Sequence, residues 1–436
     1  MLDVHRKNMS RHVEGDSVKR RRIVFGVMLF CLILTGCQEK EKEKVEITLI
    51  HGWGTMEEEH IRMREIYQDF EKEYPDIKLN LMSMTSSEEV VEKGGNMLSV
   101  GEIPDLVFMG GYGKDSVYRF MVENEKALDL MPYLEKDKDF KQNIAPEIIS
   151  YWEQNGHLYT LSDVLLAAGG YWYNEEIFKQ VGIEEVPVTW EEFFDVCDRI
   201  QKWSEESGSG VIPVIVTQEN STYLADAFLL DASESKEKEL MPNSIEVEDD
   251  EYRSVLEAIR RMNQYDTESG REYGYRDVGS MFNSQKTAIY VNGVWAGKLI
   301  DEKINARYAA FPGREGKSSS CLSACSGYVV GNTADKEKRD ASVKFLKYIL
   351  SEEVQERILL ETGQMPSNPQ VDLEDYKQQE PRLYQSVQEV RQADRKIEVP
   401  NNLWTTEQIE VFQNGILNVL EGKKEETEFI AEFKRK

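Results

Sequence analysis

The segment Lys286–Gly297 combines a predicted strand with an aromatic side chain that could contact a ligand. Its sequence, KTAIYVNGVWAG, alternates apolar residues as far as Asn292-Gly293, a dipeptide that favours a turn, and Trp295 follows. Ligands of open α/β sheets bind where the strands end. The indole ring of Trp295 could therefore stack on a ligand or pack in the core, and the segment taken alone favours packing.

Three other Trp residues also lie in predicted loops or at the ends of predicted elements. Trp53 follows the predicted strand 45–50 in a glycine-flanked turn, Trp172 comes after Gly169-Gly170, and Trp404 precedes a predicted helix at 409–420. The remaining Trp residues, at positions 152, 190 and 203, are expected to pack within the fold. The sequence thus offers four aromatic rings as candidate ligand contacts.

A glycine-rich loop follows the predicted strand 103–108 and includes Gly110, Gly111 and Tyr112. A phosphate-binding loop needs Ser or Thr after its Gly-Lys pair, but Asp115 occupies that position here. The loop therefore favours close approach of its backbone to a ligand over nucleotide binding.

Catalytic and metal-binding patterns are absent from the sequence. There is no HExxH motif, no pair of CxxC motifs and only five His residues, so neither a metal nor a cofactor is expected. Cys197, Cys321 and Cys325 are expected to be small buried thiols rather than a disulfide framework.

The N-terminal segment has the features of an export signal. Four consecutive basic residues, ending at Arg22, precede the apolar run 23–34, which is too short to cross a membrane. Leu34-Thr35-Gly36-Cys37 resembles the bacterial lipobox, in which Cys37 would carry the lipid. The tract 38–44 has no apolar residue and is expected to be a solvated tether. We expect residues 1–36 to be a signal peptide and 37–44 a lipid-anchored linker.

The net charge argues against nucleic-acid binding. The chain has a formal charge of −27 at pH 7, and no cluster of basic residues in the exported part offers contacts to phosphates. A neutral ligand remains compatible with this charge, because its site depends on local hydrogen bonds.

Alternating strand and helix patterns predict an α/β fold. A strand at 45–50, a helix at 57–74 and a strand at 77–82 form the unit of a parallel sheet. Thr189 with Glu192 predicts a capping box at the start of a helix. A hairpin is predicted at 151–160, and one long amphipathic helix at 341–360.

The order and spacing of these motifs resemble those of extracellular solute-binding proteins of bacterial ABC sugar importers, the group that includes maltose-binding protein. The motifs that carry the resemblance are the lipobox, 103–108 with its loop, 158–174, 188–193, 286–297, 325–331 and 345–366. The resemblance implies two α/β lobes with mixed, mainly parallel sheets. The first lobe would comprise 45–164 and 327–362, and the second 168–322 and 366–436, with hinge crossings near 165–168, 323–326 and 363–367.

A sugar site combines aromatic rings, which cover the C–H faces of the ligand, with polar side chains that bind its hydroxyls. The resemblance therefore makes Trp295 the first candidate for a stacking ring. The other candidate ligand contacts are Trp404, Trp53, Trp172, Gly110, Gly111, Tyr112, Asp163, Asn292 and Tyr328. Met109 and Gly110 stand where maltose-binding protein has Trp and Asp, which argues against maltose itself.

The resemblance also implies a mechanism and partners. A monomer anchored by Cys37 on the extracellular face of the cell membrane would close its lobes on a carbohydrate and deliver it to the permease subunits of an ABC transporter. Two other functions stay open: a lipoprotein that reports a ligand to a receptor kinase, and an exported glycoside hydrolase. No motif assigns the two carboxylates that hydrolysis needs. A peptide or phosphate ligand would call for more charged groups near the cleft.

Overall fold

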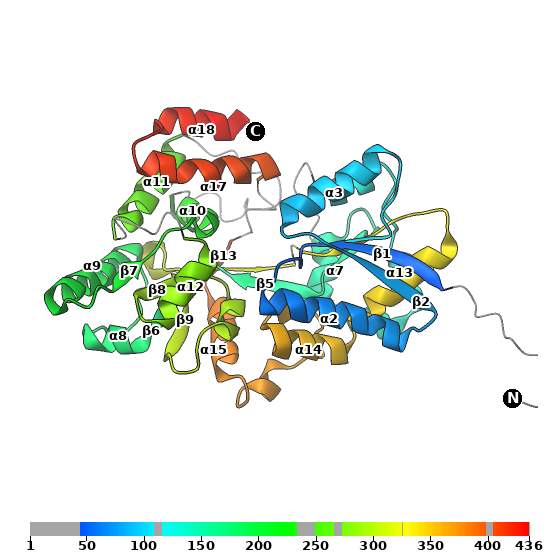
Figure 1. Ribbon diagram of the computed structural model, residues 1–436, viewed down its shortest axis with the longest axis horizontal. Coiled ribbons are helices and arrows are strands. Elements are labelled where there is room, and N and C mark those ends of the chain that lie inside the picture. The colour runs from blue at the N-terminus through cyan, green and yellow to red at the C-terminus, as the bar shows by residue number, and fades with distance from the viewer. Residues whose placement is uncertain are drawn as a thin grey trace, which may run out of the picture. The chain divides into compact units, whose positions relative to one another are not determined.

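Figure 1 shows the computed structural model of the chain, which describes residues 44–108, 116–232, 249–265, 273–324, 326–397 and 404–435. Residues from Val45 onward form one compact unit. The predictions for the signal peptide, Cys37, Gly110, Gly111, Tyr112 and Cys325 lie outside the described residues.

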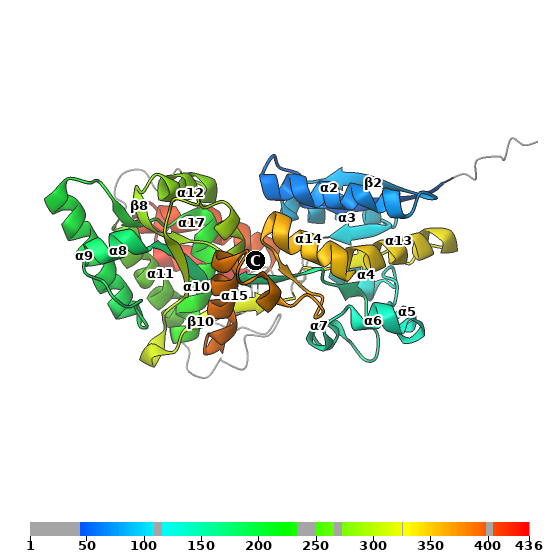
Figure 2. The same ribbon diagram turned by 90° about the horizontal axis from the view of Figure 1, so that it is seen from below.

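The first sheet has five strands in the order β2-β1-β3-β11-β4. β1 pairs in parallel with β2 and β3, whereas β11 is antiparallel to both β3 and β4. Figure 1 and Figure 2 show helices α2, α3 and α13 beside this sheet. The bounds are β1 Val45–His51, α2 Glu58–Glu73, β2 Ile77–Ser83, α3 Ser87–Ser99, β3 Leu106–Phe108, α4 Val117–Glu123, α5 Met131–Lys136, α6 Lys138–Gln142, α7 Pro146–Trp152, β4 Thr160–Leu161, β11 Tyr328–Val330, α13 Lys336–Ile349 and α14 Glu352–Thr362.

The second sheet has four strands in the order β7-β8-β6-β9. Only β7 and β8 pair in parallel, so parallel pairing is concentrated in the first sheet. The bounds are β6 Gly170–Asn174, α8 Glu175–Gln180, α9 Trp190–Ser207, β7 Ile212–Val214, α10 Gln218–Ala232, α11 Asp249–Asn263, α12 Tyr275–Asn283, β8 Thr287–Val291, η2 Val294–Lys298, β9 Ala306–Ala310, η3 Arg314–Gly316, η4 Leu373–Tyr376, α15 Pro381–Gln392, α17 Thr406–Leu420 and α18 Glu426–Arg435.

A third sheet brings the predicted hinge crossings together. Its order is β12-β5-β10-β13, with bounds β12 Met365–Pro366, β5 Val164–Ala168, β10 Ser319–Ser323 and β13 Arg395–Lys396. β5 pairs antiparallel with β10 on one side and β12 on the other, and Figure 1 shows it running between the two other groups of elements. Each segment predicted to cross between lobes therefore contributes to this sheet or directly adjoins it.

Gly169, immediately after β5, requires glycine for two reasons. Its φ is +73°, in the left-handed region that residues with a side chain avoid. An added Cβ would also lie 2.7 Å from the backbone nitrogen of Cys321 on β10. The close approach of β5 and β10 thus depends on this glycine.

The buried hydrophobic residues form three clusters. One draws on residues 47–164 and 324–358, and a second on residues between 168 and 433. The third covers another part of the second sheet and includes Trp172, Tyr290 and Met365. This distribution is consistent with the two predicted lobes, whose boundaries stay a prediction.

Several local predictions are confirmed. β1, α2 and β2 form the expected unit, and Thr189 and Glu192 form the capping box of α9. Cys197 and Cys321 are fully buried, as predicted.

Two local predictions are wrong in extent. Of the predicted hairpin at 151–160, the tight turn at Asn155-Gly156 is formed, closed by an antiparallel bridge between Gln154 and His157, but residues 151 and 152 belong to α7 instead of a strand. The predicted long helix at 341–360 is two helices, because Ser351 caps a new start by accepting a hydrogen bond from the backbone N–H of Val354. No helix in the described ranges is long and apolar enough to span a membrane.

Candidate functional site

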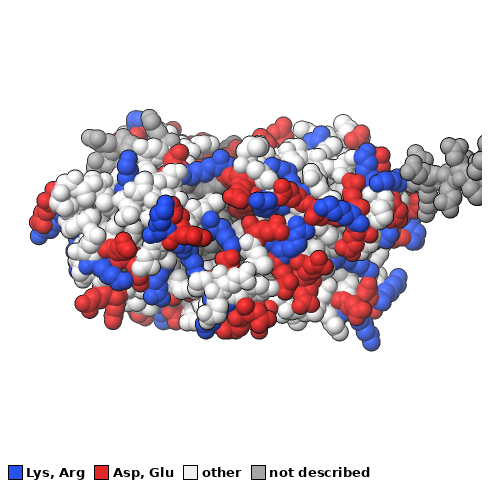
Figure 3. Space-filling view, turned by 60° about the horizontal axis from the view of Figure 1, so that its bottom comes forward, with Lys and Arg blue, Asp and Glu red and all other residues white. Residues whose placement is uncertain are grey.

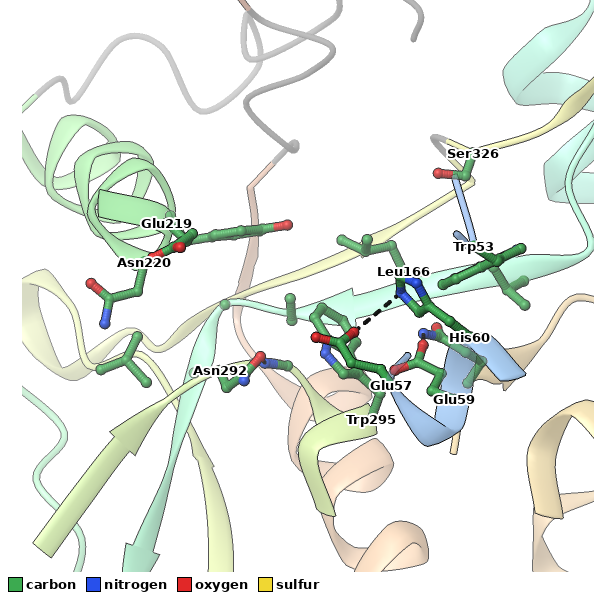
Figure 4. Close-up of a pocket in the computed structure, with 18 of the residues that line it drawn as sticks. Trp53, Glu57, Glu59, His60, Leu166, Glu219, Asn220, Asn292, Trp295 and Ser326 are labelled. Atoms are coloured by element: carbon green, nitrogen blue, oxygen red, sulfur yellow. Dashed lines mark hydrogen bonds and ion pairs between the residues drawn. The ribbon is translucent and has the colours of Figure 1, made fainter. Parts of the chain in front are cut away.

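A cavity of about 350 Å³ lies where residues of all three sheets and their connections meet. Figure 4 shows Trp53, His60 and Glu59 on one side of it and Glu219, Asn220 and Asn292 on the other. Its walls are largely aromatic and aliphatic, with a few polar groups. The lining residues are Trp53, Glu57, Glu59, His60, Phe108, Val164, Leu166, Ala168, Gly169, Gly170, Glu219, Asn220, Tyr223, Val291, Asn292, Gly293, Trp295, Phe311, Ser326 and Gln364.

Trp295 lines this cavity from the 3₁₀ helix that follows β8. Its ring folds back over Gly293, where an added Cβ would lie 2.1 Å from the indole. Asn292 holds the turn, because its side-chain oxygen accepts from the Gly293 N–H at 2.7 Å while its amide group donates to the Tyr290 hydroxyl at 2.6 Å. The partly buried ring is thereby held in place by the turn that the sequence predicted.

Trp53 lines the facing wall and is only 5% exposed. Its ring stacks on Phe108 with 5.8 Å between ring centroids, and His60 meets it edge-on at 5.0 Å. Its backbone N–H donates to Nδ1 of His51 at 3.1 Å. The ring is therefore fixed before any ligand arrives, which lowers the entropic cost of binding.

Three carboxylates line the cavity, and they have different partners. Glu57 forms an ion pair with Arg276 of α12 and lies 3.3 Å from Nε2 of His60. Glu59 accepts a hydrogen bond from the side chain of Gln364. Glu219, at the start of α10, is exposed, and the hydrogen bond that it accepts from the Thr222 hydroxyl at 3.1 Å goes to its backbone carbonyl oxygen, which leaves its carboxylate at the cavity wall. Glu219 is therefore available to a ligand.

Burial changes the protonation of the groups near Trp53. Desolvation raises the pKa of Glu59 to about 7, so this carboxyl group can donate as well as accept a hydrogen bond near neutral pH. Burial also lowers the pKa of His60, which favours the neutral ring. The wall around Trp53 therefore carries less charge than its residue types suggest.

The structure places Asp163 and Tyr328 in the core instead of at the cavity surface. Both are fully buried, and the Tyr328 hydroxyl donates to Oδ2 of Asp163 at 2.6 Å. Burial raises the pKa of Asp163 to about 7. Direct contact of these two residues with a ligand finds no support in this arrangement.

Trp172 and Trp404 are also buried away from the cavity lining. Trp172 is fully buried on β6, where its Nε1–H donates to the carbonyl oxygen of Gly293 at 2.9 Å. Trp404 packs against Phe412 and Phe433 in the second core. Of the predicted ligand contacts, the structure brings Trp53, Asn292 and Trp295 together at the cavity, and Trp172 supports the turn beneath Trp295.

Several lining residues were missed from the sequence. Glu57 and Glu59 lie at the start of α2, and Glu219 and Asn220 at the start of α10, each shortly after a strand of an α/β sheet. Polar residues at the start of a helix that follows a strand were the signal that could have identified them. Gln364 follows Gly363, which ends α14 in the left-handed conformation. No sequence pattern predicted that the side chain of Gln364 would line a cavity.

The site has the properties of a binding site. An apolar cavity with a few fixed polar groups suits a small ligand, and no group of His, Cys, Asp or Glu side chains in the described part of the chain could hold a metal ion. Together with mixed α/β sheets joined by a third sheet, this arrangement defines a small-molecule binding protein.

The model for the bacterial extracellular solute-binding protein family matches residues 65–384, which is most of the chain, so the chain belongs to this family of binding proteins. It is 23% identical over 337 residues to the Multiple sugar-binding protein of Streptococcus mutans serotype c, covering 74% of this chain and 76% of that protein. The predicted family and the prediction that the chain is not an enzyme are confirmed.

Solved structures confirm the predicted fold. A Streptococcus pneumoniae solute-binding protein in complex with the blood group A-trisaccharide superposes with a TM-score of 0.72 at 19% identity, covering 89% of this chain and 98% of that chain. Maltose-bound T. maritima MalE3 gives a TM-score of 0.71 at 18% identity, with coverages of 89% and 98%.

Proposed function

We propose that this chain captures an uncharged sugar or oligosaccharide in the cavity and delivers it to the permease of an ABC transporter. The observation that carries this proposal is the composition of the cavity wall. Trp53, Trp295, Phe108, Phe311 and Tyr223 supply aromatic surface, and no Lys or Arg is among the described lining residues. Rings match the C–H faces of a sugar, and the polar groups match its hydroxyls.

Charge favours a neutral ligand over an acidic one. Glu57 and Glu219 line the cavity as carboxylates, so a uronic acid or a sugar phosphate would bring a like charge to them. On the face shown in Figure 3, acidic and basic side chains of the described residues are interspersed. Rejection of acidic sugars would therefore arise in the cavity itself.

Relatives support the class of ligand. The Streptococcus mutans relative is named for multiple sugars, and the two similar structures hold a trisaccharide and maltose. Room for more than one sugar ring is present, because a second depression of about 580 Å³ shares Glu59 and Trp295 with the first cavity. We therefore favour an oligosaccharide that passes Trp295.

Capture would involve closure about the third sheet. The cavity draws Trp53 and His60 from one side and Glu219 and Trp295 from the other, so a ligand that touches both sides favours the closed state. The ion pair between Glu57 and Arg276 joins the same two sides. A lipid on Cys37 would hold the protein on the extracellular face of the membrane, beside the permease.

The test is a thermal-shift and calorimetric screen of the purified protein against neutral oligosaccharides. We expect at least one to raise the melting temperature and Trp295→Ala to weaken its binding more than tenfold. Trp203→Ala is the matched control, because Trp203 packs against the second core and does not line the cavity. No binding by any neutral oligosaccharide, or equal binding by Trp295→Ala, would contradict the proposal.

A further inference from the structure

A chain of buried hydrogen bonds leads away from the cavity wall. The Nε1–H of Trp53 donates to the hydroxyl oxygen of Tyr67 at 3.0 Å. The hydroxyls of Tyr67 and Tyr328 lie 2.7 Å apart, and Tyr328 donates to Asp163 at 2.6 Å. Trp53 is the member of this chain that lines the cavity, and Asp163 is its inner end. These four residues are called the Trp53 relay below.

The Trp53 relay is shielded from solvent and packed on both sides. Tyr67, Tyr328 and Asp163 are fully buried. Phe108 stacks on Tyr328 with ring centroids 4.4 Å apart and also stacks on Trp53. In such an apolar setting each hydrogen bond is stronger than in water, and an unpaired polar group would be costly.

The carboxylate end sets the direction of every bond in the relay. An ionised Asp163 has no hydrogen to donate, so the Tyr328 hydroxyl must donate to it. The Tyr328 oxygen then accepts from Tyr67, which leaves the Tyr67 oxygen to accept the indole N–H of Trp53. Each donor has one acceptor, and the indole N–H can only donate. The order of the four groups therefore gives the indole N–H and both hydroxyls a partner, with Oδ2 of Asp163 as the final acceptor.

The inner end of the relay lies at a crossing point of the third sheet. Asp163 directly precedes β5, and its carbonyl oxygen accepts from the backbone N–H of Ser367 at 3.2 Å. Its neighbour Val164 pairs with Pro366 on β12. The relay thus links a side chain of the cavity wall to the place where two of the predicted hinge segments meet.

We propose that Tyr67, Tyr328 and Asp163 are positioning residues for ligand binding, which fix the ring plane of Trp53 in the cavity wall and tie it to the hinge segment at Asp163. Because the indole N–H is held inward, Trp53 presents ring surface and no hydrogen-bond donor to the ligand. This inference rests on the proposed function, because it requires that a ligand binds in the cavity. It also gives Asp163 and Tyr328 an indirect role in place of the direct contact predicted from the sequence.

The first experiment is a double-mutant cycle in the full exported chain. Tyr67→Phe and Tyr328→Phe each remove one hydroxyl and keep the ring. Each is expected to weaken binding of the best neutral oligosaccharide three- to tenfold at pH 8, where Asp163, with a pKa of about 7, is mostly ionised. In a Trp53→Phe background, which has no indole N–H to hold, Tyr67→Phe should have no further effect.

Tyr348→Phe is the matched control, because the Tyr348 hydroxyl donates to the carbonyl oxygen of Ile66 at 2.7 Å in the same core, outside the relay. It should lower stability as the relay variants do and leave affinity unchanged. Unchanged affinity in both relay variants, or additive losses in the cycle, would overturn the inference.

A second readout needs no ligand. In ¹⁵N-tryptophan spectra, with the Trp53 signal assigned by its loss in Trp53→Phe, Tyr328→Phe should shift the indole N–H resonance of Trp53 although it acts two hydrogen bonds away. An unmoved Trp53 signal would overturn the inference even if no sugar bound. Failure of the wild-type protein to bind any sugar would instead refute the proposed function, so the two outcomes are distinguishable.

Discussion

Replacing Asp163 by asparagine should change how the stability of the protein depends on pH. Burial raises the pKa of Asp163 from 3.8 to about 7 in the folded protein. Between these values the folded state holds a proton that the unfolded state has lost, so the free energy of unfolding falls as pH rises through this window. The Asp163→Asn side chain has no such proton, and its amide oxygen can still accept from the Tyr328 hydroxyl.

The structure sets the scale of this effect. A rise in pKa from 3.8 to about 7 corresponds to about 4 kcal/mol of unfolding free energy, as an upper figure for a fully buried group. Only about two of these three pH units lie above pH 5, so Asp163→Asn should gain up to about 3 kcal/mol of stability relative to the wild type between pH 5 and pH 8.

Urea unfolding at pH 5, 6, 7 and 8 measures this difference directly. Burial also raises the pKa of Glu59, so this group adds to the pH dependence of stability in the same direction. Glu59→Gln serves as the control, because it removes the contribution of Glu59 alone. If Asp163→Asn keeps the full pH slope of the wild type, the argument from the buried carboxyl group is refuted.

Three further predictions concern the hinge, the charge of the ligand and the ion pair across the cavity. Gly169→Ala should lower the free energy of unfolding by about 1–3 kcal/mol, because its φ is +73° and Cys321 is close; an unchanged melting temperature would contradict this. Acidic oligosaccharides should bind at least tenfold more weakly than neutral ones of the same length in calorimetric titrations. Glu219→Gln should reduce this difference in affinity, and an unchanged difference would show that Glu219 does not cause it. Arg276→Ala should weaken ligand binding by at most about fivefold, since the Arg276 side chain is 53% exposed and exposed ion pairs contribute about 0–1 kcal/mol. This loss of affinity should disappear at high salt, and a loss that persists at high salt would contradict a purely electrostatic role of Arg276.

The elements that the sequence predicted correctly are those with a strong local signal. The alternation before Asn292 gave β8 and its turn, and Thr189 with Glu192 gave the start of α9. The hinge crossings were placed by resemblance to the family, and their segments do meet in one sheet. The break between α13 and α14 was missed because the helical spacing of apolar residues continues across it. The break depends on one residue, Ser351, whose hydroxyl accepts the hydrogen bond that caps α14.

The candidate site was predicted less completely, because exposure depends on the tertiary fold. Trp172 and Trp295 both follow turn-forming glycines, yet the first is fully buried and the second lines the cavity. Asp163 and Tyr328 were chosen as polar groups near a cleft, and only the fold shows that their partners are each other and Tyr67. No periodicity in sequence reports such contacts between residues 165 positions apart.

A crystal structure of the protein with its best-bound neutral oligosaccharide tests the central claim most directly. We predict that a sugar ring lies in the cavity with its C–H face on Trp295, that polar side chains from both sides bind its hydroxyls, and that Trp53 adds a flat wall without donating a hydrogen bond. A ligand bound elsewhere, or one that leaves Trp295 uncovered, would contradict the account.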